Sequence, residues 1–236
     1  GSTLVDDACG VCGGDGSSCG SQLLLVPSEY TSIQSAIWDA QEGDTVLVSP
    51  GVYNEALFIN KNIVLTSYAI YDDLDDWGTE DSVLNDNILN TVIDPSGIEF
   101  PDETFQSAIM VYSSSERDGC IEPYILGFTI QGGTGTEVEY VNEDGETETE
   151  FRGGGIFILN ASPALHFNFI KENGDIDTNT GGGINDTSGI DYPTQDPPVS
   201  RYSDPDDNWD GPRSECDESV DLADNFYKNN QATIGN

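Results

Sequence analysis

Two phrases of this chain recur, and that recurrence is the feature that most constrains its fold. The phrase GGGI at 153–156 returns 28 residues later at 181–184. The phrase NFIKEN at 168–173 returns as NFYKNN at 225–230. Repetition with a period of roughly 20–50 residues indicates stacked units, each of which buries its apolar face only against its neighbours.

Short apolar runs bounded by Gly, Asn and Pro lie between and before these repeats. Ile156–Leu159 and Leu165–Ile170 are strand-like runs joined by a turn that contains Asn160 and Pro163. Such runs favour a coil of parallel strands over helix pairs. Gly and Asn tolerate the positive φ of tight corners, and Asn side chains can stack between equivalent corners. Further strands are predicted at Leu23–Val26, Thr45–Val48, Val52–Tyr53, Ala56–Ile59, Ile63–Ser67, Thr91–Ile93, Ala108–Tyr112 and Tyr124–Ile130.

One segment near the start has helical spacing instead. In Ser32–Ala40, the apolar residues Ile33, Ala36, Ile37 and Ala40 recur at intervals of three and four. Thr31 or Ser32 is the expected N-cap. A short helix here would cover the end of the first coil and shield its strand edges. Trp38 is expected to be a boundary aromatic of this cap.

Two parts of the sequence resemble a known superfamily. GFTIQGG (Gly127–Gly133) and the 153–184 stretch resemble the right-handed parallel β-helix, or pectin-lyase-like, superfamily of secreted proteins. Tyr30–Ser67, with its GDTVLVSPGVY phrase, resembles the first coils of that superfamily. The resemblance implies an all-β solenoid with a short N-terminal capping helix and long acidic loop insertions. It implies no single function, because one fold hosts many activities.

The charge balance is extreme. Forty-four acidic residues against seven basic ones give a formal net charge of −37. Such a field repels nucleic acid and anionic membranes and attracts cations. The sequence also has no run near the roughly 18 apolar residues of a membrane span. Calcium is therefore the expected counter-ion, and no nucleic-acid partner or membrane span is expected.

The five cysteines indicate an extracellular setting. Cys9, Cys12 and Cys19 lie within a Gly/Ser/Asp-rich segment, residues 1–20, which is predicted to be a linker or arm. Cys120 and Cys216 lie far apart in loop-like sequence. Disulfides are the favoured interpretation, with the pairing open and at least one thiol left over. Zinc bound by the three N-terminal thiolates is the alternative.

Residues 21–236 are predicted to form one β-helix domain with three insertions, near 71–90, 134–152 and 185–222. In the second insertion, residues of different character alternate along the chain on both sides of Asp144-Gly145. This pattern predicts a projecting β-hairpin over Thr136–Phe151. The third is long, acidic and rich in proline. Long insertions of this kind are usually functional.

The third insertion contains the clearest metal-binding pattern. Asp206, Asn208 and Asp210 occupy the first, third and fifth positions of a D-x-[DN]-x-[DN]-G calcium loop, and Asp217 falls at the twelfth. Alternate side-chain oxygens on a tight loop converge on one hard cation. Because EF-hands usually carry Glu at the twelfth position, the loop resembles the isolated calcium loops of secreted modules more closely.

A second acidic cluster, Asp72, Asp73, Asp75 and Asp76, precedes Trp77. It is expected to be a solvated charge run. Trp77 and Trp209, each inside an acidic loop, are the candidates for a sugar-stacking platform, with local packing as the alternative.

Polysaccharide lyases on this fold pair a basic residue with calcium-binding carboxylates. The candidate bases are Arg117, Arg152, Lys171 and His166. Lys171 recurs with the repeat, which favours a structural role, and His166 is expected to face solvent. Two glycosylation sequons begin at Asn160 and Asn185.

The sequence therefore predicts a secreted or cell-surface, calcium-stabilised β-solenoid with a structural or surface-interaction role rather than an enzyme. Self-association head to tail into filaments is expected, because solenoid ends expose strand edges. An extracellular polysaccharide is the other candidate partner. The alternative function is a carbohydrate-active enzyme, either lyase or hydrolase, or a glycan-binding module.

Overall fold

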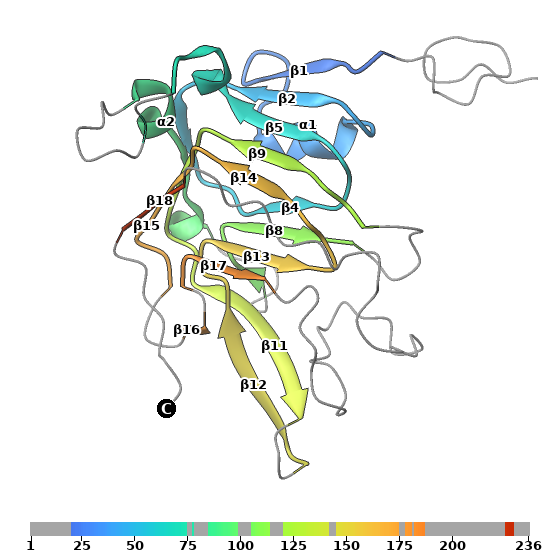
Figure 1. Cartoon of the computed structure of the whole chain (residues 1–236), viewed down its shortest axis with the longest axis vertical. Coiled ribbons are helices and arrows are strands. Elements are labelled where there is room, and N and C mark those ends of the chain that lie inside the picture. The colour runs from blue at the N-terminus through green and yellow to red at the C-terminus, as the bar shows by residue number, and fades with distance from the viewer. Residues whose placement is uncertain are drawn as a thin grey trace, which may run out of the picture.

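The chain folds mostly into short strands, which form parallel sheets, and it has few helices (Figure 1). The structure is a computed structural model. It describes residues 20–74, 77, 85–98, 105–113, 120–141, 145–174, 178–180, 182–186 and 225–228. The arm at residues 1–19 and most of the third insertion, residues 187–224, lie outside the described residues.

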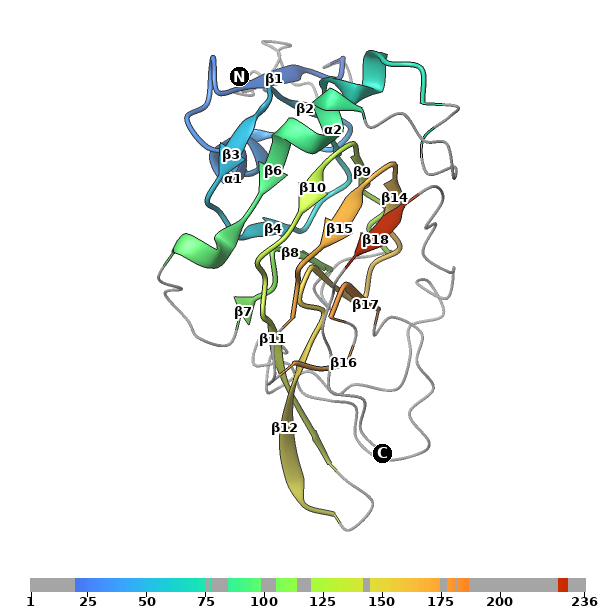
Figure 2. The ribbon, with the colours of Figure 1, turned by 90° about the vertical axis from the view of Figure 1, so that its left-hand side faces the viewer.

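Three parallel sheets form the body (Figures 1 and 2). Sheet one consists of β1 (Leu23–Val26), β2 (Thr45–Val48), β5 (Val64–Ser67), β9 (Tyr124–Leu126) and β14 (Ala164–His166). Sheet two consists of β3 (Gly51–Tyr53), β6 (Thr91–Ile93), β10 (Thr129–Ile130), β15 (Phe169–Lys171) and β18 (Phe226–Lys228). Sheet three consists of β4 (Leu57–Ile59), β8 (Ile109–Tyr112), β13 (Ile156–Leu159) and β17 (Ile184–Asp186).

The chain visits the three sheets in a fixed order. From β2 to β17 it passes through sheets one, two and three and then returns to sheet one, adding one strand to each sheet in each passage, and β18 is a further strand of sheet two. We call one such passage a circuit. In sheet one the register aligns five buried apolar residues, Leu24, Val46, Leu65, Ile125 and Leu165. Such aligned positions face inward and form one continuous core.

Both sequence repeats fall at matched register. Ile156 pairs with Ile184 in sheet three. Phe169 pairs with Phe226, and Lys171 with Lys228, in sheet two. The repeats therefore mark equivalent positions in consecutive circuits, as their recurrence predicted.

Two predicted strands are wrong in their extent. Tyr124–Ile130 divides into β9 and β10, and Leu165–Ile170 divides into β14 and β15, with each half in a different sheet. The break falls at Gly127 (φ +82°) in one circuit and at Phe167 (φ +54°) in the next. A residue with a positive φ turns the backbone from one sheet to the next. Glycine commonly takes this conformation, but phenylalanine rarely does, so the sequence did not indicate a turn at Phe167.

The predicted asparagine stacking is present at this corner. Asn168 is fully buried, and its Nδ2 donates to the Ile125 carbonyl at 2.9 Å. Its Oδ1 accepts from the Phe128 amide at 3.1 Å. The same Nδ2 also lies 3.1 Å from Oδ1 of Asn225, the equivalent residue of the repeat. The side chain thus satisfies the backbone of the preceding circuit where the strands end.

The GGG repeat forms the corner between sheets two and three. The Gly155 amide donates to the Gly182 carbonyl at 3.0 Å, and the Ile156 amide donates to the Gly183 carbonyl at 2.8 Å. A Cβ on Gly154 would lie 2.5 Å from the Gly174 nitrogen and 2.6 Å from the Gly182 oxygen. Successive circuits therefore touch backbone to backbone, and no side chain fits between them.

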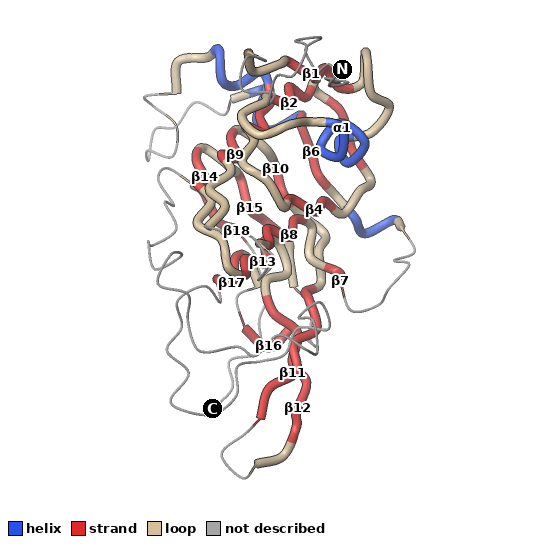
Figure 3. Tube along the Cα trace, turned by 90° about the vertical axis from the view of Figure 1, so that its right-hand side faces the viewer, coloured by secondary structure: helices blue, strands red, loops and turns tan. Residues whose placement is uncertain are grey.

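The predicted helix is α1 (Ile33–Asp39), with Ser32 as its N-cap. The helix packs against β1, β2 and β4 (Figure 3). The Glu55 carboxylate accepts from the Ile33 and Gln34 amides, and Lys61 Nζ donates to the Ala40 carbonyl at 2.8 Å. The negative charge of Glu55 thus lies at the N-terminus of the helix and the positive charge of Lys61 at its C-terminus, where each interacts favourably with the helix dipole. The Gln34 side chain bonds both the amide and the carbonyl of Phe58 and so covers the edge of β4. Trp38 is 69% exposed on this cap.

The insertions follow the circuits at their corners. The first, predicted to be a loop, also contains η1 (Tyr68–Tyr71) and α2 (Asp86–Asn90). The second is the predicted hairpin, β11 (Gly135–Val141) with β12 (Thr147–Arg152), which projects from the body (Figure 1). At its base it pairs with β7 (Phe105–Gln106) and β16 (Thr178–Thr180), while η2 (Pro95–Gly97) follows β6.

We expect Gly154→Ala to lower the free energy of unfolding by about 3 kcal/mol, the upper end for inserting a methyl group into packed structure. The new Cβ would meet backbone atoms, which cannot move aside as a flexible side chain can. Urea unfolding measures the change. Gly97→Ala is the matched control, since its Cβ would have only one neighbour, the Asn54 amide nitrogen at 3.8 Å. Equal stability of the two variants would contradict the close approach.

Candidate functional site

The predicted calcium ligands cannot be placed. Asp206, Asn208, Asp210 and Asp217 all lie outside the described residues, as does Trp209. Within the described ranges, no three His, Cys, Asp or Glu side chains are grouped so that they could hold a metal ion. The calcium site therefore stays a prediction.

The first insertion uses its acidic and aromatic residues for packing. Asp72 Oδ2 accepts from the side-chain amides of Asn85 and Asn87, each at 2.8 Å. These two hydrogen bonds lower the pKa of Asp72. Trp77 is only 8% exposed and packs with Ala69, Ile88 and Leu126. Of the two alternatives for Trp77, local packing is therefore the one that the structure supports.

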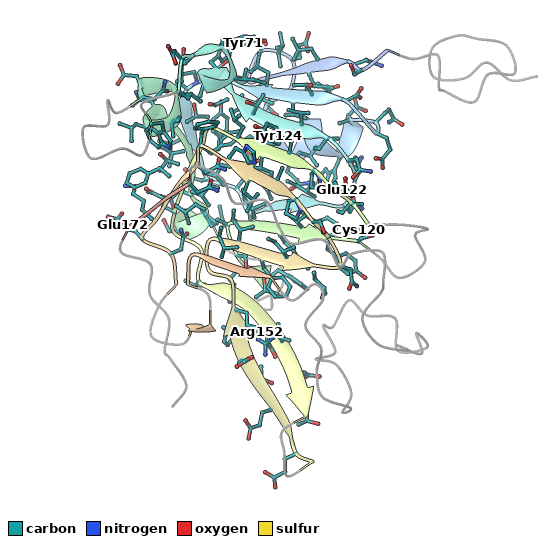
Figure 4. The ribbon with its side chains drawn as sticks, in the orientation of Figure 1. Tyr71, Cys120, Glu122, Tyr124, Arg152 and Glu172 are labelled. Carbon is teal, nitrogen blue, oxygen red and sulfur yellow. The ribbon has the colours of Figure 1, made fainter. Side chains whose placement is uncertain are left out.

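Each described candidate base already has a partner. Arg152 is buried at the base of the hairpin and donates from Nε to the Glu150 carboxylate. Lys171 Nζ lies 3.6 Å from a Glu172 oxygen and 5.7 Å from the centre of the Phe169 ring. Arg117 lies outside the described residues. Figure 4 shows Arg152 at the base of the hairpin and Glu172, the partner of Lys171, away from it in that view.

His166 does not face solvent as predicted. It is half-buried, with Nδ1 3.3 Å from the Tyr124 hydroxyl and the two ring centres 5.1 Å apart. The register places it beside Leu126, which belongs to the cluster that the first insertion forms over sheet one. Alternation along the strand correctly put His166 outside the core but could not reveal this outer layer.

The corner that follows sheet two contains a polar site that the sequence did not indicate. Asp94 comes directly after β6. Its Oδ1 accepts from the Ser96 amide at 3.0 Å, and its Oδ2 accepts from Gln131 Nε2 at 2.7 Å. The Asn54 side chain donates to its carbonyl at 3.1 Å. Asp94 thus connects three circuits, and an alignment of residues following the sheet-two strands would have found it.

Several influences set the charge state of Asp94. Burial, the largest, raises its pKa, but the hydrogen bonds from Ser96 and Gln131 and the positive charge of Lys171 together outweigh burial. The net effect is a lowered pKa. The ionised carboxylate is therefore stabilised by a local contact with Ser96 and by Gln131 and Lys171, which lie beside it only when the circuits are stacked.

Two further predicted features concern modification. Asn160 of the first sequon is 8% exposed with φ +52°, which leaves no room for a bulky glycan. Asn185 of the second lies in β17. Cys120 is half-buried, its Sγ 3.5 Å from Ser162 Oγ, whereas Cys9, Cys12, Cys19 and Cys216 lie outside the described residues.

Comparison of the chain with protein-family models, with curated proteins and with solved structures gives no match. Function is therefore inferred from the contacts of this chain. Among the described residues, no helix has the length and apolar character needed to cross a membrane.

We expect Asp94→Asn to lower the free energy of unfolding at pH 7 by about 1 kcal/mol, since hydrogen bonds to a half-buried charged group are discounted for the solvent that reaches it. Because the folded-state pKa is lowered, this contribution is present above the ordinary value of 3.8 and is lost as the pH falls through the folded value. Urea unfolding at pH 7 and near pH 3 measures the loss of stability in Asp94→Asn and its dependence on pH.

The difference in the free energy of unfolding between the wild type and Asp94→Asn should thus be smaller near pH 3 than at pH 7. Glu122→Gln, an exposed carboxylate at another corner, is the control and should have little effect at either pH. A difference for Asp94→Asn that is equally large at both pH values would contradict the assigned role of the ionised carboxylate.

Proposed function

We propose that this chain is a right-handed parallel β-helix that serves a structural or surface-interaction role outside the cell. The fixed order of the three sheets and the matched register of the repeats support the β-helix. The handedness follows the strong preference of crossovers between parallel strands. The resemblance of GFTIQGG and the GGG stretches to secreted β-helix proteins supports a location outside the cell.

One observation carries the structural role: polar side chains at the corners are used to join circuits. Asn168 satisfies the backbone of the preceding circuit, and Asp94 connects three circuits. Arg152 and Lys171, candidates for a catalytic base, are paired with Glu150 and Glu172. A cationic group that is already paired with a carboxylate is less suited to proton transfer with a substrate.

Calcium binding by Asp206, Asn208, Asp210 and Asp217 is part of the proposal and rests on loop spacing and on the net charge of −37. Disulfide bonding is also part of it. The proposed bond would join Cys120 to one of the other four cysteines. Both features suit an extracellular protein.

Self-association completes the proposal. Within the described residues, β14, β17 and β18 are the last strands of their sheets, and the opposite end is covered by α1. A strand at the end of a sheet offers backbone groups to another chain. Repulsion between copies opposes the contact until cations screen or bridge them.

We expect calcium to raise the melting temperature. Ligand at a hundredfold excess over its dissociation constant adds about 2.7 kcal/mol, on the order of 5–10 °C for a domain of this size. Melting curves in EDTA and in millimolar calcium measure the shift. Asp206→Asn combined with Asp210→Asn should abolish most of it, whereas Asp86→Asn, on α2, should preserve it. Superimposable curves for the wild type would refute calcium binding.

Assembly should depend on calcium as well. Light scattering of the wild type is expected to show growth of larger species as calcium is added, and chelator should reverse it. Sodium chloride at matched ionic strength separates simple screening from bridging by the divalent ion. A monodisperse monomer at every calcium and protein concentration would end the proposal of self-association, without bearing on the fold.

A further inference from the structure

The largest exposed aromatic side chain of the first insertion is presented on a fixed support. Tyr71 is 69% exposed at the end of η1, and Tyr68 is 37% exposed at its start. Their ring centres are 6.0 Å apart and their planes are inclined by 56°. Ile70 between them is 41% exposed. Figure 4 shows Tyr71 at the outer edge of the molecule.

The support is held by several short-range contacts. The Ser67 hydroxyl caps η1 by accepting from the Ala69 amide at 3.1 Å. The same hydroxyl donates to the Gly127 carbonyl at 2.6 Å and so fixes the cap to the next circuit. Ala69 is fully buried against Trp77 and Ile88. A surface that is ordered before it binds avoids the entropy cost of ordering on binding.

A carboxylate, which is a hydrogen-bond acceptor, follows the second of the two rings in the chain. Asp72 follows Tyr71, and its Oδ2 is held by the Asn85 and Asn87 side chains. The other oxygen, Oδ1, has no hydrogen-bond partner among the described residues. These two asparagine amides therefore orient the carboxylate while leaving one oxygen available to a donor from solution.

We propose that Tyr68, Tyr71 and Asp72 form a binding surface for a neutral polysaccharide. A pyranose ring has an apolar face that packs on an aromatic ring and hydroxyl groups at its rim that donate hydrogen bonds. Tyr68 and Tyr71 supply the aromatic rings, and Asp72, the next residue of the chain, supplies the acceptor. A protein with a net charge of −37 repels a polyanionic chain, so a neutral glycan is the occupant.

The site differs from the platform that the sequence indicated. Trp77, the residue with the larger ring, is buried within the cluster that supports η1. The tyrosines that precede the acidic run occupy the surface instead. This site is independent of calcium binding and of the structural role proposed above, because its residues lie in a different insertion.

Affinity gel electrophoresis of the wild-type protein tests the site, with a soluble neutral glucan or mannan in the gel and polygalacturonate as the anionic comparison. The neutral polymer should retard the wild type, and polygalacturonate should not. Tyr71→Ala should weaken binding about tenfold, corresponding to the loss of one stacking contact. Tyr71→Phe keeps the ring and should retain most of the binding.

Trp38→Ala is the matched control, because Trp38 has the same exposed fraction, 69%, on α1 and lies outside η1. It should bind as the wild type does. No retardation by any neutral polymer, or equal loss in Trp38→Ala and Tyr71→Ala, would overturn the proposal. So would light scattering that shows a dimer lost in Tyr71→Ala without glycan binding, since the occupant would then be a second copy. The melting temperature of each variant checks that folding is retained.

Discussion

Stacking of backbone on backbone at the corners is the constraint on which this structure depends. Parallel strands in neighbouring circuits keep their register only if the chain turns at the same place each time. At one corner, Asn168 satisfies an amide and a carbonyl of the circuit before it. At the next, Asn173 does the same for Gly133 and Ile130. At these two corners a buried asparagine supplies, through its side-chain amide, the hydrogen bonds that the backbone loses at the turn.

The unusual acidity of the chain is partly put to the same use. With seven basic residues, ion pairs can neutralise only a small part of the charge. Several carboxylates instead accept backbone or amide hydrogen atoms. Asp44, which is 4% exposed, accepts from the Gln22 and Gln41 amides at 2.7 Å. Glu55 holds the start of α1 and Asp94 joins three circuits. Acidic residues thus serve as turn acceptors, a role that needs no cationic partner.

The repetition, the apolar runs and the helical spacing of 32–40 are local signals, and they predicted most strands and α1 correctly. Corners without a turn residue could not be predicted, and Phe167 with its positive φ is the example. The five-residue helix α2 has a sequence, DNILN, with no helical periodicity to detect. The contacts of Asp94 and His166 depend on which residues the stacking brings together from 37 to 42 positions away. Local sequence holds no information on such distances.

The arrangement of circuits also explains why both proposed sites lie in insertions. Each circuit contacts only the circuits on either side, so its strands and corners are committed to stacking. A segment inserted between two sheets leaves that stacking intact, as the first insertion does between β5 and β6. Tyr71 and Asp206 of the proposed calcium loop belong to such segments, whereas Asn168 and Asp94 are engaged where the circuits stack. Substitutions at exposed positions of the insertions can therefore change binding without disturbing the core, whereas substitutions of Asn168 or Asp94 would remove contacts between circuits.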